Sequence, residues 1–209
     1  MEDTRTTAAR EHFDRWSETY EQDSAARWLR EIQTQALAAL ALTANDVLLD
    51  VGCGTGAAVR DAAPNVRRAV GFDLSPGMIA QARDRAAGLD NVDFHTGDVT
   101  GRLPFDDDAF TALVCTTAFH HFPKPSDTIA EMSRVLAPGG RLVIADANRR
   151  HPVVFALDLV LRVAQASHAG FRSPGRLMHE LCAAGFVGVS YCTIRGRSYA
   201  FVRGEKPRG

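Results

Sequence analysis

The stretch from Val47 to Ala57, Val-Leu-Leu-Asp-Val-Gly-Cys-Gly-Thr-Gly-Ala, constrains the fold of this chain more than any other feature. Its first five residues form an apolar run, which is typical of a strand buried on both faces of a parallel sheet. Glycines then occupy alternate positions, where a side chain would block close approach of a ligand to the backbone. A strand, a glycine-rich turn and a helix in this order predict a nucleotide-binding loop.

Strands and helices are expected to alternate through the following hundred residues. The apolar runs predict strands at 47–51, 69–72, 92–96, 111–116 and 142–145, with helices at 75–88 and 126–136. Ser75-Pro76 indicates a helix start, and Pro138-Gly139-Gly140 indicates a helix end. Because alternation of this kind is typical of βαβ units, it predicts a parallel, doubly wound sheet.

The two ends of the chain depart from this alternation. Near the start, Phe13, Trp16 and Tyr20 are spaced as one face of a helix. A second helical face is formed by Ala25, Trp28, Leu29, Ile32, Ala36 and Leu40. Near the end, helices at 151–166 and 173–185 precede strands at 187–193 and 198–202, which flank Arg195-Gly196-Arg197 as an antiparallel hairpin. We therefore expect an α/β fold with N-terminal helices and a mainly parallel seven-stranded sheet that ends in this hairpin.

Composition excludes several classes of protein. The chain has 209 residues, 45% of them hydrophobic, and a formal net charge of −1, so we expect one globular domain and no nucleic-acid partner. Its four cysteines include no CxxC pair, so no metal site is expected. No stretch is long and apolar enough for a membrane span, and the N-terminus has no signal-peptide core. We expect a cytoplasmic protein.

Two acidic residues follow predicted strands. Asp73 lies 21 residues after Gly52, a spacing that fits a carboxylate bound to the ribose hydroxyls of an adenosine. Asp98 follows the next strand. Because ligands of such sheets bind beyond the carboxyl ends of the strands, Asp98 is a candidate for the adenine amino group. The alternative for Asp98 is an Asx turn within its loop.

Five segments resemble one family in their order and spacing. They are LLDVGCGTG (48–56), GFDLSPGMI (71–79), GDVTGRLPFDDDAF (97–110), AFHHF (118–122) and RVLAPGGRLVIAD (134–146). Together they resemble class I S-adenosylmethionine (SAM) dependent methyltransferases. The closer likeness is to the small-molecule group that includes the ubiquinone and menaquinone biosynthesis type (methyltransferase domain 11-like). The segment FDRWSETYE (13–21) is similar to the cofactor lid of this group.

The resemblance implies a Rossmann-like fold and a single SAM-binding domain over 1–209, with a helical lid at 1–45. The implied cofactor-binding residues are Tyr20, Asp50, Gly52, Cys53, Gly54, Gly56, Asp73, Leu74, Met78, Gly97, Asp98, Val99 and Thr116. The glycines would line the methionine end, Asp73 would hold the ribose, and Leu74 with Met78 would enclose the adenine. Asp98 and Val99 would address the polar edge of the adenine. Thr116 would sit beside the cofactor, and Tyr20 would close over its methionine part. Packing roles for Tyr20, Leu74 and Met78 stay open as alternatives.

Methyl transfer from SAM is an in-line displacement, so a general base is needed only if the acceptor must lose a proton. His120 and His121 follow the fourth predicted strand, close to the expected site. The similar group often carries a histidine pair here, whose second member is usually structural. The resemblance therefore favours His120 as the catalytic candidate, against a packed, hydrogen-bonded histidine. Asp146 and His151 are weaker candidates.

The expected activity is methyl transfer to a small-molecule acceptor, which leaves S-adenosylhomocysteine (SAH). The acceptor and the oligomeric state, monomer or homodimer, stay open. The segment 147–172 is expected either to cover the acceptor or to form a dimer contact.

Two alternatives remain. Gly52, Gly54 and Ala57 also fit the dinucleotide fingerprint of an NAD(P)-dependent oxidoreductase, although no Tyr-x-x-x-Lys pair is present. The other alternative is a SAM-binding module without catalysis.

Overall fold

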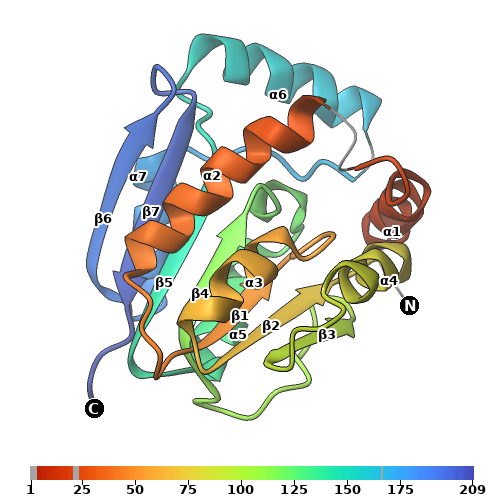
Figure 1. Ribbon diagram of the computed structural model, residues 1–209. Coiled ribbons are helices and arrows are strands. Elements are labelled where there is room, and N and C mark those ends of the chain that lie inside the picture. Colours follow the sequence, from red (N-terminus) through yellow and green to blue (C-terminus); the bar gives the residue numbers. More distant parts are fainter. Residues whose placement is uncertain (1–3, 21–23, 166) are drawn as a thin grey trace.

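The computed structural model describes residues 4–20, 24–165 and 167–209. One sheet has the strand order β3-β2-β1-β4-β5-β7-β6 (Figure 1). Its strands are β1 (Val47–Val51), β2 (Arg68–Asp73), β3 (Val92–Thr96), β4 (Phe110–Thr116), β5 (Leu136–Ala147), β6 (Val187–Ile194) and β7 (Tyr199–Glu205). The first five strands pair in parallel, and β7 runs antiparallel to both of its neighbours. The predicted Rossmann-like sheet with its C-terminal hairpin is confirmed.

Helices cover both faces of the sheet. They are α1 (Thr4–Trp16), α2 (Ser24–Leu40), α3 (Ala57–Ala62), α4 (Pro76–Arg85), α5 (Pro125–Val135), α6 (Pro152–Ala164) and α7 (Pro174–Ala183). The side chain of Leu48 packs with residues of α2, α3 and α4, whereas Leu49 packs with residues of α5 and α7. Successive residues of β1 thus face opposite layers, which explains why the whole strand is apolar apart from Asp50.

The N-terminal helix differs from the prediction. It begins at Thr4 and ends at Trp16, so Tyr20 lies beyond it. The hydroxyl of Ser17 donates to the carbonyl of Asp14 at 2.8 Å, which gives the backbone an alternative to further helix. The rings of Trp16 and Tyr20 still meet edge to face, with centroids 4.7 Å apart.

The second predicted helical face is partly observed. Ile32, Ala36 and Leu40 of α2 are fully buried, as expected. The side chains of Ala25 and Trp28 lie outside the described part of the chain, as does Ala166 at the predicted end of the helix at 151–166.

The fifth strand also differs from the prediction. Pro138-Gly139-Gly140 is not a helix-ending turn, because β5 begins at Leu136 and runs through it. The N–H of Gly139 donates to the carbonyl of Lys206 at 2.9 Å, and the N–H of Lys206 donates to the carbonyl of Gly140 at 2.9 Å. The C-terminal segment thereby supplies partners that keep this stretch extended. These long-range partners are not visible in the local sequence.

Candidate cofactor and acceptor site

A cavity lies where β1, β2, β3 and β4 reach their carboxyl ends, and residues of α1 and α2 contribute to its wall. Eleven predicted cofactor-binding residues line it: Tyr20, Gly52, Cys53, Gly54, Asp73, Leu74, Met78, Gly97, Asp98, Val99 and Thr116. Three other predicted site residues, Asp50, Gly56 and His120, are not among its lining residues.

The glycine loop opens toward the cavity at Gly54. Its φ is +53°, in the left-handed region, and no atom lies within 4 Å of where a Cβ would stand. The N–H of Gly54 donates to Oδ2 of Asp73 at 2.8 Å, which joins the loop to the end of β2. Gly56 has a different role, because a Cβ there would stand 2.6 Å from the ring of Phe94. Gly54 thus leaves room for a ligand, and Gly56 lets the loop pack on β3.

Asp73 sits at the edge of the cavity with its carboxylate already oriented. Oδ1 accepts the N–H of Ser75 at 2.9 Å, and Oδ2 accepts the N–H of Gly54. Burial raises the pKa of Asp73, and these backbone donors only partly offset that effect. Each carboxylate oxygen keeps a second lone pair for a hydroxyl group.

Asp50 is a buried acid without a partner in the described chain. It is fully buried on β1, two residues before Gly52, and neither carboxyl oxygen has a hydrogen-bond partner. Burial, and then the charge of Asp73, raise the pKa of Asp50 to about 8. A cationic group bound nearby would favour the ionised form of this carboxyl. The open cradle at Gly54 and the unpartnered Asp50 therefore fit a ligand that carries positive charge.

The far side of the cavity combines apolar and polar groups. Met78 is almost fully buried, yet it lines the cavity together with Leu74. The hydroxyl of Ser75 caps α4 by accepting the N–H of Met78 at 3.0 Å, as predicted. Asp98 forms the Asx turn, because its Oδ1 accepts the N–H of Thr100 at 2.8 Å, and it also lines the cavity.

The helix α1 is held over the cavity by one aspartate that the sequence did not reveal. Oδ1 of Asp14 accepts the N–H of Gly77 at 3.0 Å and the hydroxyl of Ser75. Both donors lie at the start of α4. Phe13, beside Asp14, lines the cavity and meets the ring of His121 edge to face, with centroids 5.0 Å apart. A lone aspartate in a helix carries no recognisable signal, so only the fold identifies this anchor.

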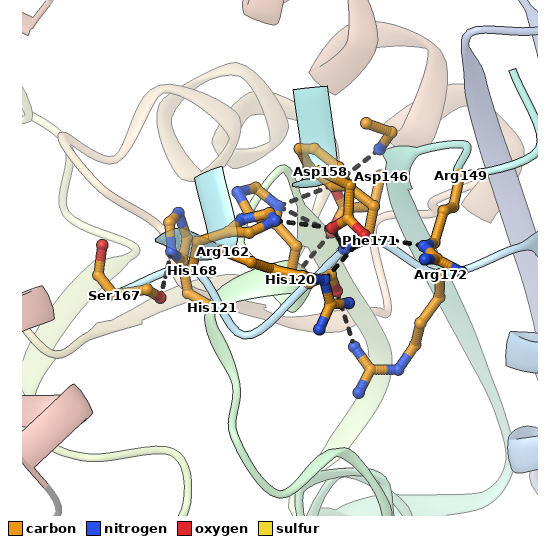
Figure 2. Close-up of polar contacts among 12 residues, drawn as sticks. His120, His121, Asp146, Arg149, Asp158, Arg162, Ser167, His168, Phe171 and Arg172 are labelled. Carbon is orange, nitrogen blue, oxygen red and sulfur yellow. Dashed lines mark hydrogen bonds and ion pairs between the residues drawn. The ribbon is translucent and has the colours of Figure 1, made fainter. Parts of the chain in front are cut away.

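The histidine pair lies in a short turn, Phe119–His121, after β4. His121 lines the cavity, and its Nδ1 lies 2.9 Å from the carbonyl oxygen of Ser167 (Figure 2). Because a carbonyl only accepts, Nδ1 carries the proton and Nε2 keeps a lone pair. Burial, and then the charge of His120, hold the pKa of His121 well below its usual value. His121 is therefore neutral at pH 7.

His120 points to Asp146, not to the cavity. Its Nδ1 lies 2.9 Å from Oδ1 of Asp146, and its backbone N–H donates to Oδ2 at 2.8 Å (Figure 2). Its carbonyl accepts the N–H groups of Ala169 and Gly170 at 2.9 and 3.0 Å. The resemblance favoured His120, but the structure places its neighbour on the cavity wall and uses His120 and Asp146 to hold the turn. Of the two weaker candidates, Asp146 binds His120, and His151 precedes α6; neither is a lining residue.

Much of the remaining wall was not predicted. Besides Phe13 and His121, the unpredicted lining residues are Thr6, Ala9, Leu29, Arg30, Gln33, Thr55, Ala57, Phe72, Thr100, Thr117, Ala118, Phe122 and Pro123. Most are apolar or weakly polar, so their types give no signal of a site. Ala118 and Phe122 belong to the AFHHF segment, and Thr117 precedes it, but the sequence assigned no role to any of them.

Comparison with known proteins identifies the class. The family model described as a methyltransferase domain matches residues 49–144. The demethylmenaquinone methyltransferase of Clavibacter sepedonicus is 30% identical over an alignment of 221 positions. The alignment covers 94% of this chain and 89% of the relative. The chain therefore belongs to the SAM-dependent methyltransferases.

Solved structures agree on the fold. One describes a complex between the Haloferax volcanii Trm112 methyltransferase activator and a methyltransferase, with a TM-score of 0.82, 22% identity, and coverage of 93% of this chain and 97% of that one. A SAM-dependent methyltransferase from Aquifex aeolicus has a TM-score of 0.67, 19% identity, and coverage of 83% and 88%. The family assignment favours SAM over the NAD(P) alternative.

Proposed function

We propose that this methyltransferase acts on an apolar, ring-bearing small molecule with a phenolic or quinol hydroxyl, and that His121 receives the hydroxyl proton. The observation that carries the proposal is the cavity wall around His121. Phe13, Ala118 and Phe122 provide apolar surface there, and the neutral imidazole is the titratable group among them. The name of the Clavibacter relative, which specifies a menaquinone precursor, supports the same acceptor class.

The cofactor would lie along the ends of β1, β2 and β3. SAM supplies a methyl group activated on a sulfonium when it is bound. Gly52, Cys53 and Gly54 would line its methionine end, and Thr116 would lie beside it. Asp73 would hold the ribose, Leu74 and Met78 would enclose the adenine, and Gly97, Asp98 and Val99 would border its polar edge. The carboxylate of Asp50, on β1 just before the loop, would compensate the positive charge of the cofactor. Tyr20 would close over the methionine part together with α1. Gly56 would shape the loop without touching the ligand.

The residues of the chain would position the acceptor and hold one proton. The helix α1, anchored by Asp14, would exclude water from the reacting atoms. The acceptor hydroxyl would donate to Nε2 of His121. As the acceptor takes up the methyl group, the hydroxyl proton would move to Nε2 of His121. The low pKa of His121 keeps Nε2 unprotonated before that step.

The domain organisation, the localisation and the oligomeric state are also proposed. The chain is proposed to work as one domain, with 1–45 as the lid. We also place it in the cytoplasm, as a monomer or homodimer.

A methyl-transfer screen over small phenols, quinols and amines, read as SAH release, tests the acceptor class. We expect turnover with phenols or quinols and none with amines. His121→Gln should lower kcat by about 100-fold or more with little change in the KM for SAM, the range for loss of a general base. The matched control is His179→Gln, on the exposed side of α7, which should leave kcat unchanged. Turnover confined to amines, or full activity of His121→Gln, would contradict the proposal.

A further inference from the structure

The helix α6 presents a large apolar surface to solvent. Six of its apolar side chains are 44 to 90% exposed: Val153, Phe155, Leu157, Leu159, Val160 and Val163. We call these six residues the α6 surface. Single exposed apolar residues are ordinary, but a contiguous set on one helix indicates an interaction site. In Figure 1, α6 runs across the top of the molecule above α2, and no labelled element lies over it.

The α6 surface spans a wider arc of the helix than a contact between two helices needs. Val154 and Asp158 are buried against the protein. At about 100° per residue, the six exposed side chains span an arc of roughly 200° on the opposite side. No charged residue lies within this arc, since Asp158 and Arg162 fall outside it. A broad apolar face is typical of a helix that lies in a lipid interface, whereas the contact stripe between two helices is narrower.

The charges around α6 match an anionic surface. The segment 147–172 contains four arginines and a single acid, Asp158. That acid is buried, and Arg149 and Arg162 bind it at 2.8 and 2.9 Å. Arg150 is exposed just before α6. Arg197 is exposed in the β6–β7 turn, which Asn148 holds next to the start of α6 through a 2.8 Å bond to the Arg197 carbonyl. Cations therefore gather at one end of the apolar surface.

A second copy of the chain fits the α6 surface less well. Thirteen helical residues extend about 20 Å, and a contact stripe about 10 Å wide covers on the order of 200 Å². A stable protein interface buries about 800 Å² on each partner. A helix-to-helix contact would also leave the flanks of the 200° arc in water. A lipid surface has neither limit, because acyl chains can contact the whole of the exposed arc.

We propose that the α6 surface binds this protein to the face of an anionic lipid bilayer, with α6 in the plane of the interface. Within the described residues, no helix is long and apolar enough to cross a membrane. The segment that follows α6 contacts one residue of the cavity wall, because the Ser167 carbonyl holds His121, and Oδ1 of Asp158 joins this segment to α6 through His168. Docking would thus place the cavity wall near the lipid. The idea that an apolar acceptor reaches the cavity from the bilayer rests on the proposed function. The binding of the α6 surface to lipid does not.

Co-sedimentation with vesicles tests the proposal without any activity assay. The purified protein should bind vesicles of equal parts phosphatidylglycerol and phosphatidylcholine, and bind pure phosphatidylcholine vesicles more weakly. The double variant Val160→Glu/Val163→Glu should lose at least tenfold in partitioning, because two carboxylates would enter the apolar arc. The control is Val187→Glu, at an exposed valine that begins β6 and lies away from α6. It should bind like the parent protein.

The folded state of each variant is checked by circular dichroism and thermal unfolding. Arg150→Glu/Arg197→Glu provides a second probe that leaves the apolar arc intact, and it should weaken binding to the anionic vesicles only. The proposal is overturned if the parent protein does not sediment with either vesicle type. It is also overturned if the glutamate variants bind like the parent, or if sedimentation velocity shows a dimer that Val160→Glu/Val163→Glu converts to a monomer. SAH titration is independent of all these outcomes, so failure here is distinguishable from failure of the proposed function.

Discussion

Two buried aspartates in this chain have opposite electrostatic environments. Asp50 on β1 and Asp158 on α6 are both fully buried. Asp158 is bound by the side chains of Arg149, Arg162 and His168 and by the N–H of Phe171, each at 2.8 to 2.9 Å (Figure 2). Asp50 has no partner in the described chain.

The pKa shifts follow from this difference. Burial alone would raise the pKa of both carboxyls, and at Asp50 burial, together with the charge of Asp73, raises the pKa to about 8. At Asp158 the hydrogen bonds from Arg149 and Arg162 outweigh burial, so the pKa falls well below its usual value. A buried acid with a full set of donors holds the structure together. A buried acid without donors, beside an open loop, indicates a site whose partner comes from outside the chain.

The largest expected effect comes from removing Asp158. Asp158→Ala leaves His168 and the N–H of Phe171 buried without an acceptor, so we expect a loss of about 3 to 5 kcal/mol in the free energy of unfolding. Urea unfolding at pH 7 measures it. The control, Asp61→Ala, breaks an exposed pair with Arg30 and should change stability by less than about 1 kcal/mol. If Asp158→Ala and Asp61→Ala lower the free energy of unfolding equally, the buried ion pairs of Asp158 contribute no more to stability than an exposed pair.

Removal of Asp73 should affect ligand binding more than folding. Asp73→Ala is expected to weaken SAM binding by about 1 to 3 kcal/mol, roughly 5- to 150-fold, because charge-assisted hydrogen bonds to the ribose are lost. Calorimetric titration of SAM measures the change. Asp93→Ala, an exposed aspartate on the neighbouring β3, serves as the control. If affinity for SAM is the same in Asp73→Ala and the parent, the ribose has been assigned to the wrong residue.

A third prediction is a pH dependence of stability due to Asp50. Its pKa is about 8 in the folded protein against an ordinary value of 3.8, so the folded state binds more protons than the unfolded state between these values. Stability from this group is therefore fully present below pH 3.8 and is lost as pH rises toward 8. The slope is at most about 1.4 kcal/mol per pH unit.

Asp50→Asn removes that titration. The difference in unfolding free energy between parent and variant, measured from pH 5 to pH 8 without ligand, should increase with pH in favour of the variant. If the unfolding free energies of parent and variant change with pH in parallel, the carboxyl of Asp50 does not have a raised pKa in the ligand-free protein, and the account of this residue is wrong.

The strands β1 to β4 and the glycine loop could be predicted from the sequence. The central strands β1 and β4 are buried on both faces, so they are almost entirely apolar, and the glycine loop follows from local backbone geometry. Asp73 was foreseeable from its spacing. The orientation of the histidine pair was not, because it depends on Asp146 and on Ser167, 26 and 46 residues further along the chain. The role of Asp14 and the extended start of β5 depend on partners that are still further away in the chain, Gly77 and Lys206 respectively.

The segment 147–172 shows the same limit. Its apolar pattern predicted a helix, and α6 is present. However, none of its described residues is among those lining the cavity, and six of its apolar side chains face solvent. Periodicity indicates that a helix has an apolar face but does not specify which side the protein covers. That choice depends on Asp158, which draws one side of α6 onto Arg149 and His168.

Calorimetric titration of the purified chain with SAH and, separately, with NADH tests the central claim most directly, since it asks which nucleotide the glycine loop and Asp73 hold. The account predicts that SAH binds at one site per chain, that Asp73→Ala weakens this binding, and that NADH gives no saturable heat. Saturable binding of NADH together with no response to SAH would contradict it.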